Sequence, residues 1–174
     1  MSIRVLQARA YQLLRSGAAR IPTRGRVLLR AACLPSNKGG AASWELCEIV
    51  DSKRRRDHVA GFRTHWDLEE DQRRLDHKDE DGEPTEPTLV TSRVRVPTPL
   101  DDELLALVAN LHVPLWPSDH PRGLDGAKRV LVLGSKFARS TLEWWAHGPE
   151  AWRPATDAFD EVWTRLESLD RAYR

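Results

Sequence analysis

Histidine, cysteine and acidic side chains are the residues in this chain that could build a metal or catalytic centre. The six histidines include no pair at the i, i+4 spacing of a helical zinc motif, and the two cysteines lack the close spacing of a zinc ribbon. There is no G-x-S-x-G elbow and no phosphate-binding glycine loop leading into a helix. A site assembled in space, for example from His65 with Asp67, stays open as an enzyme alternative. The sequence predicts no cofactor and no metal, and it leans away from catalysis.

A basic run, Lys53, Arg54, Arg55 and Arg56, is the candidate nucleic-acid site. Together with an arginine-rich N-terminal segment, in which Glu45 is the first acid, it could supply phosphate contacts. The net charge of the whole chain is only +1, and no RRM, KH or zinc-finger signature is present. Nucleic-acid binding is therefore the alternative function and not the first.

Seven tryptophans are the strongest signal for protein binding, above all the doublet Trp144–Trp145 and the loop residue Trp116. Neighbouring residues of a strand point to opposite faces, so the two rings of the doublet cannot enter the same core. Tryptophan is also enriched among residues that dominate protein interfaces. The opposing interpretation is that the N-terminal segment or the 112–126 loop covers the outward ring. We predict that Trp144, Trp145 and Trp116 contact a protein partner.

Acidic residues gather between positions 67 and 86, where they could steer a basic partner. Within 65–78, Glu69 and Glu70 each stand four residues before an arginine, which favours a surface helix. Both glutamates are predicted partner-binding residues. The following 79–88 is rich in acids and prolines and is predicted to be a mobile acidic loop.

The first half of the chain is predicted to contain a helix and a hairpin. The first fifteen residues fit a helical stripe slightly better than strand alternation. Residues 25–34 and 43–51 are predicted strands joined by a glycine-rich turn. A turn centred on two glycines would place Cys33 opposite Cys47, either as a redox or metal pair or, more commonly, as two small buried side chains.

The second half has clearer boundaries. We predict a strand at 89–98, a helix at 98–111, an irregular connection at 112–126, a hairpin from 127–134 and 139–147, and a final amphipathic helix. The expected fold class is α+β: an antiparallel sheet built from two hairpins, with helices packed mainly on one face. At 174 residues, the chain is expected to form a single domain, 1–174.

Composition predicts a soluble protein of the cytoplasm. Hydrophobic residues make up 40% and charged residues 30% of the chain, and no segment reaches the roughly 18 apolar residues of a membrane span. No secretory signal is evident, and two cysteines make no disulfide framework. The acid-free N-terminus would also suit a mitochondrial transit peptide, which stays the minor alternative.

Residues 124–170 combine a DG turn, a hairpin, a Trp-Trp strand end, the segment GPEAWRP and a terminal amphipathic helix. This pattern resembles small bacterial proteins, some of which serve as immunity or defence-associated partners. The resemblance implies a bacterial immunity or inhibitor protein, or an accessory subunit of a defence-type complex. The sequence thus predicts a non-catalytic protein that binds another protein and does not bind membranes.

Overall fold

The fold is taken from a computed structural model of the chain. The structure describes residues 2–17, 25–36, 40–50, 53, 56–77, 85–117, 126–134 and 139–173. Much of the predicted acidic loop at 79–88, and both Arg54 and Arg55, lie outside these residues. Among the described helices, none is long and apolar enough to cross a membrane.

The chain contains four α-helices, one short 3-10 helix and six strands among the described residues. In sequence order they are α1 (Ile3–Ser16), β1 (Gly25–Pro35), β2 (Ala42–Val50), β3 (Arg56–Trp66), α2 (Leu68–Asp76), β4 (Leu89–Val96), α4 (Thr98–Ala109), β5 (Ala127–Gly134), β6 (Arg139–Trp145), the short 3-10 helix η1 (Glu150–Trp152) and α5 (Arg153–Ala172).

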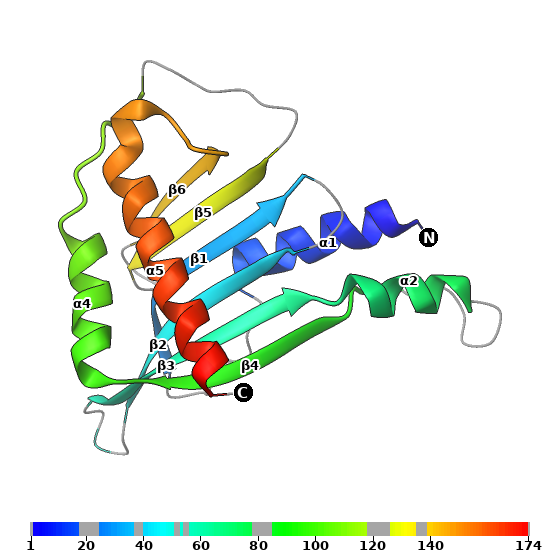
Figure 1. The fold of residues 1–174 in the computed structure, drawn as a ribbon, viewed down its shortest axis with the longest axis horizontal. Coiled ribbons are helices and arrows are strands. Elements are labelled where there is room, and N and C mark those ends of the chain that lie inside the picture. Colours follow the sequence, from blue (N-terminus) through cyan, green and yellow to red (C-terminus); the bar gives the residue numbers. More distant parts are fainter. Residues whose placement is uncertain are drawn as a thin grey trace.

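The strands form one six-stranded sheet in the order β4-β3-β2-β1-β5-β6 (Figure 1). Every neighbouring pair is antiparallel. Strand β1 lies inside the sheet, because it pairs with β2 on one side and with β5 on the other. This pairing joins the first and second halves of the chain into one continuous sheet.

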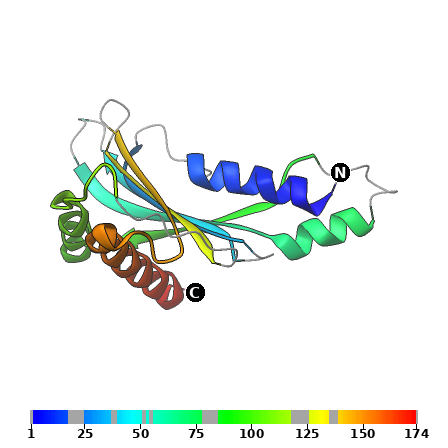
Figure 2. The same cartoon turned by 90° about the horizontal axis from the view of Figure 1, so that it is seen from above.

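Helices cover both faces of this sheet: α1 lies on one side, with α2 next to it beyond the end of β3, and α4 and α5 lie on the other side (Figure 2). The larger core packs α4 and α5, through Leu104 and Phe159 among others, onto Trp44 and Leu131 of the sheet. The second core packs the buried face of α1 onto the opposite side of the sheet, through Leu6, Ala10, Leu14, Ala32 and Val130.

The structure confirms the α+β class but differs from the expected arrangement in two respects. The sheet is not built from two hairpins alone, because β3 and β4 extend it, and the helices are not confined mainly to one face. The missing element was β3, whose alternating residues are buried on both sides: Val59 belongs to the α5-side core, while Phe62 lies on the α1 side. A sheet with two apolar faces needs a helical layer on each.

Strand β3 ends at Trp66, which the sequence pattern assigned to the surface helix. The helix α2 starts after Asp67, whose side chain accepts a hydrogen bond from the backbone N–H of Glu70. Asp71 then anchors α2 because its buried carboxylate accepts hydrogen bonds from the Trp66 indole, at 2.7 Å, and from Thr88. These contacts explain how a helix with a thin apolar stripe is fixed to the fold.

The first hairpin has a different register from the one expected. Cys33 lies opposite Ala42, and Cys47 lies opposite Val27. The predicted pairing of the two thiols is therefore wrong, because β1 continues to Pro35 and the turn is centred earlier than its two glycines suggest. Cys33 packs against the α5-side core and Cys47 lies in a separate cluster with Ala60 and Phe62.

Candidate functional site

The tryptophan doublet at the end of β6 divides between the two faces of the sheet. Trp144 is only 5% exposed and faces α5, where its ring meets Trp152 and Phe159 edge-on, with centroids 6.5 and 5.5 Å apart. Trp145 is half-buried and lies on the α1 side. Trp144 is thus a core residue of the chain, whereas Trp145 borders the surface.

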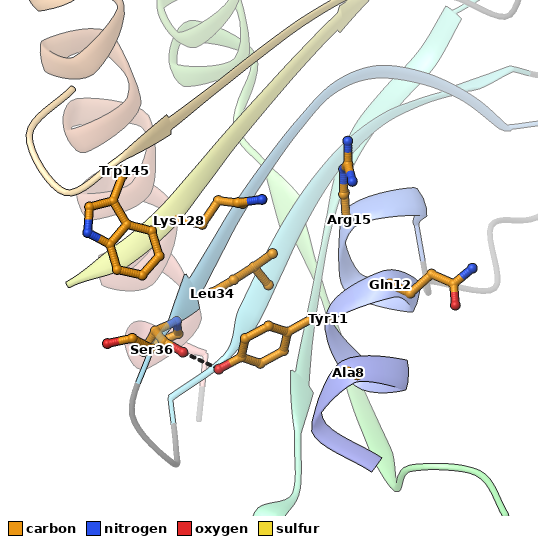
Figure 3. Close-up of a pocket in the computed structure, with 9 residues that line it drawn as sticks. Ala8, Tyr11, Gln12, Arg15, Leu34, Ser36, Lys128 and Trp145 are labelled. Atoms are coloured by element: carbon orange, nitrogen blue, oxygen red, sulfur yellow. Dashed lines mark hydrogen bonds between the residues drawn. The ribbon is translucent and has the colours of Figure 1, made fainter. Parts of the chain in front are cut away.

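Trp145 lines a hollow of about 310 Å³ between α1 and the sheet. Figure 3 shows Trp145 and Tyr11 on either side of this hollow, with Leu34 and Lys128 between them. The remaining lining residues come from α1 and from the end of β1: Ala8, Gln12, Arg15, Pro35 and Ser36.

Tyr11 is held in place as a wall of the hollow. Its hydroxyl donates a hydrogen bond to the backbone carbonyl of Pro35, and Gln7 donates to the same hydroxyl at 2.9 Å. Its ring packs edge-on against Trp66, with centroids 6.4 Å apart. Burial raises the pKa of Tyr11, so the hydroxyl stays protonated and keeps its role as donor. The wall is therefore pre-formed, which lowers the entropic cost of filling the hollow.

A second hollow of about 300 Å³ shares Gln12 and Arg15 with the first. It lies along β6 beside Thr141 and Glu143, and its other lining residues are Val130, Val132, Ser16 and Arg139. We call the two hollows together the α1–β6 groove.

Charged residues stand around this groove. Arg15 forms an ion pair with Glu143, and the Lys128 ammonium lies 3.9 Å from the same carboxylate. Arg139 makes no ion pair with any residue that the structure describes. Three cations thus line the groove beside one carboxylate, which leaves the groove net positive.

A second apolar surface is the pair Leu115–Trp116, whose side chains are 98% and 84% exposed. The residues on each side return to the fold, since Val113 is half-buried and Pro117 is buried. The Trp152 indole donates a hydrogen bond to the carbonyl of Pro114 at 2.9 Å. We call this exposed pair the Leu115–Trp116 tip.

The predicted partner-binding residues do not come together in one place. Glu69 is exposed on α2, and the carboxylate of Glu70 accepts a hydrogen bond from Arg73. Trp145 lies in the groove on the α1 side. Trp116 follows α4, two residues after Pro114, whose carbonyl is held by Trp152 of η1 next to the α5-side core. The groove and the tip are consequently separate candidate surfaces.

The basic run offers little free charge where the structure describes it. Lys53 is an exposed turn residue, and Arg56 forms ion pairs with Asp101 and, at 3.5 Å, with Asp102. Both acids lie in α4, Asp101 in its first turn. Arg54 and Arg55 lie outside the described residues.

The groups that could do chemistry are dispersed as well. Within the described ranges, no three or more histidine, cysteine or acidic side chains gather as metal ligands do. Burial raises the pKa of both thiols, to about 12 for Cys47, so neither is activated as a nucleophile. No histidine lines either hollow of the groove.

Several groove residues were missed by the sequence analysis, including Tyr11, Arg15, Lys128 and Glu143. One signal was present: Glu143 stands two residues before Trp145, so in a strand both must face the same side. Nothing in the sequence could show that Tyr11 and Arg15 approach the same surface, because that depends on how α1 docks on the sheet. Comparison with family models, curated proteins and solved structures found no match.

Proposed function

We propose that this chain is a non-catalytic, cytoplasmic protein that binds another protein through its Leu115–Trp116 tip. The setting that fits is a bacterial immunity or inhibitor protein, or an accessory subunit of a defence-type complex. The observation that supports the proposal is the near-complete exposure of two large apolar side chains next to each other, on a backbone held at Pro114 by the indole of Trp152.

Exposure at the tip leaves binding free energy available for a partner. Burial of a leucine side chain against a complementary surface contributes about 1.5–3 kcal/mol, and a tryptophan has still more area to bury. Tryptophan is also among the residues that most often dominate an interface. In the isolated protein most of this apolar area faces water, so most of it is available to a partner.

Anchoring of the tip favours a binding role over a merely frayed loop. Pro114 and Pro117 restrict the backbone on each side of Leu115 and Trp116, and the indole of Trp152 holds the carbonyl of Pro114. Less conformational entropy is then lost when the pair docks on a partner.

The proposal is tested by placing a photo-crosslinking phenylalanine analogue at position 116 in the native host. The matched control carries the same analogue at Tyr173, which is also aromatic and exposed. We expect a discrete protein adduct at position 116 that disappears when Leu115→Ser is added, and no such adduct at position 173. Adducts with nucleic acid alone, or no adduct at position 116, would contradict the proposal.

The protein captured in this way then allows a direct measurement of affinity. Trp116→Ser should weaken binding of the purified partner at least tenfold, whereas Tyr173→Ser should change it less than twofold. Because both side chains are exposed, both variants should keep the free energy of unfolding within about 0.5 kcal/mol of the parent. Equal losses of affinity in the two variants would show that the partner does not bind at the tip.

A further inference from the structure

We propose that the α1–β6 groove is a second binding site, which takes an extended acidic peptide segment carrying one large apolar side chain from a partner protein. The groove lies on the α1 side of the sheet and the tip follows Pro114, which is held next to the α5-side core, so this proposal does not depend on the first. Three features of the groove, its apolar end, its charge and its shape, identify the occupant.

The apolar end of the groove suits a single large side chain. The rings of Trp145 and Tyr11, with Leu34 and Pro35, enclose about 310 Å³, near the lower limit of volumes seen for ligand pockets. An aromatic or long aliphatic side chain placed there would meet an aromatic ring on either side (Figure 3). Aromatic pairs of this kind add about 0.5–1.5 kcal/mol beyond the area they bury.

The charge of the groove suits carboxylates. Arg15 and Lys128 share the single carboxylate of Glu143, and their side chains are about half exposed, so these ion pairs are weak and easily extended. Arg139 lies at the far end with no described ion-pair partner. A segment with acids beside its apolar residue would complete the pairing of these cations, whereas a basic segment would be repelled.

The shape of the groove suits an extended chain and not a compact molecule. Thr141, Glu143 and Trp145 alternate along β6 and mark out a length of about 13 Å, or four residues of strand. Ala8 to Ser16 of α1 line the other side of the groove over a similar length, about 12 Å. β6 is the outermost strand of the sheet, so no other strand of the described residues pairs along its free edge.

The probe for this site is a pentapeptide with blocked ends, in which two glutamates stand on each side of a central tryptophan. Binding is measured by calorimetry and by the shift of the ¹⁵N-labelled Trp145 indole signal. Comparison peptides replace the glutamates by glutamine or lysine, or the tryptophan by alanine. We expect the glutamate peptide to bind at least tenfold more tightly than each of these, and to bind several-fold less tightly in 500 mM than in 50 mM NaCl.

Variants locate the binding in the groove. Lys128→Glu and Trp145→Ala should each weaken the glutamate peptide about tenfold. The matched control is Arg95→Glu, an exposed cation on β4 at the opposite edge of the sheet, which should change the affinity less than twofold. Trp116→Ser should also leave it unchanged, so a failure at the tip is distinguished from a failure of the groove.

Four results would overturn the proposal. Equal affinity for the glutamate and glutamine peptides would show that charge plays no part in binding. Equal losses of peptide affinity with Lys128→Glu and Arg95→Glu would show that the peptide does not bind in the groove. Binding of free indole-3-acetate as tightly as the peptide would make this a site for a small aromatic acid. Dimerisation at micromolar concentration that is abolished by Trp145→Ala would make the groove an interface between two copies of the chain.

Discussion

At the scale of single residues, the doublet Trp144–Trp145 shows how one position in a strand decides a side chain's role. Trp144 enters the core between Trp152 and Phe159, and Trp145 lines the groove on the opposite face. The indole N–H groups of both rings are buried without a hydrogen-bond partner among the described residues. The two rings differ in what surrounds them and not in their chemistry.

Alanine substitutions should separate these two environments. Trp144→Ala should lower the free energy of unfolding by about 3–5 kcal/mol, because it leaves a cavity against η1 and α5. Trp145→Ala should cost less than about 2 kcal/mol, because the ring already borders a hollow. Urea denaturation followed by circular dichroism measures both values. Equal losses would show that Trp145 is as much a core residue as its neighbour.

The Cys47 thiol should make stability depend on pH under alkaline conditions. Burial, reinforced by the carboxylate of Glu45, raises its pKa from the ordinary 9.0 to about 12 in the folded protein. Between these two values the unfolded chain loses this proton while the folded chain keeps it. The contribution of Cys47 to the free energy of unfolding therefore falls by about 1.4 kcal/mol for each pH unit above 9.

Cys47→Ala removes this titration and serves as the reference. The stability advantage of the parent over this variant should be constant up to about pH 8.5 and should shrink between pH 9 and pH 10.5. Urea midpoints at pH 8 and pH 10.5 measure it, and Cys33 is present in both proteins, so its titration cancels. Parallel pH profiles for the two proteins would contradict the raised pKa.

At the scale of elements, local signals were sufficient for most helices and for every strand except β3. Residues 98–109 form a helix with Pro99 in its first turn, as the sequence predicts, and the hairpin of β5 and β6 is found where alternation placed it. Strand β3 was missed because Gly61 and Arg63 interrupt its apolar pattern. The close packing at position 61 favours glycine, because a Cβ there would lie 3.1 Å from Val94 and 3.2 Å from the Trp44 ring.

The groove could be predicted only in part, because it is assembled from elements distant in the sequence. Strand periodicity places Glu143 and Trp145 on one face, and that much follows from local order. Lys128 joins them because β5 pairs with β6 in a register that sets Lys128 opposite Trp145. Tyr11 reaches the same place because α1 packs across β1 and β5. These are tertiary contacts, and the spacing of residues within a single element does not predict them.

The turn after β6 gives a prediction at this scale. Gly148 has φ +70°, and a Cβ there would lie 2.8 Å from Cδ1 of the buried Trp144 ring. Gly40 has the same φ but open space, with Pro35 at 3.8 Å as its nearest neighbour. Gly148→Ala should therefore be at least about 2 kcal/mol more destabilising than Gly40→Ala in thermal or urea unfolding. Equal losses of unfolding free energy in the two variants would mean that backbone strain alone, and not the contact with Trp144, causes the destabilisation.

At the scale of the whole molecule, the sheet separates two candidate surfaces. The Leu115–Trp116 tip follows Pro114, whose carbonyl is held by Trp152 next to the core of α4 and α5, and the groove lies under α1 on the other side. Neither surface shares a described lining residue with the other. Two partner segments could therefore be bound at the same time.

Independence of the two surfaces is directly measurable. With the tip's partner in excess, the glutamate peptide should bind the groove with an affinity within about twofold of that for the free protein, because coupling requires a shared contact or a conformational change. Calorimetric titration in the presence and absence of the partner makes the comparison. A change in peptide affinity of tenfold or more would show that the two binding sites are energetically coupled through the sheet.

The interior position of β1 also affects how the protein is made. One edge of β1 pairs with β2 soon after it leaves the ribosome, but its other edge must wait for β5, which begins about 90 residues later and, at usual translation speeds, roughly 5–20 s later. During this interval the nascent chain presents an apolar, unpaired strand edge. Productive folding is thus largely post-translational, and we expect ribosome-associated chaperones to protect this edge until synthesis is complete.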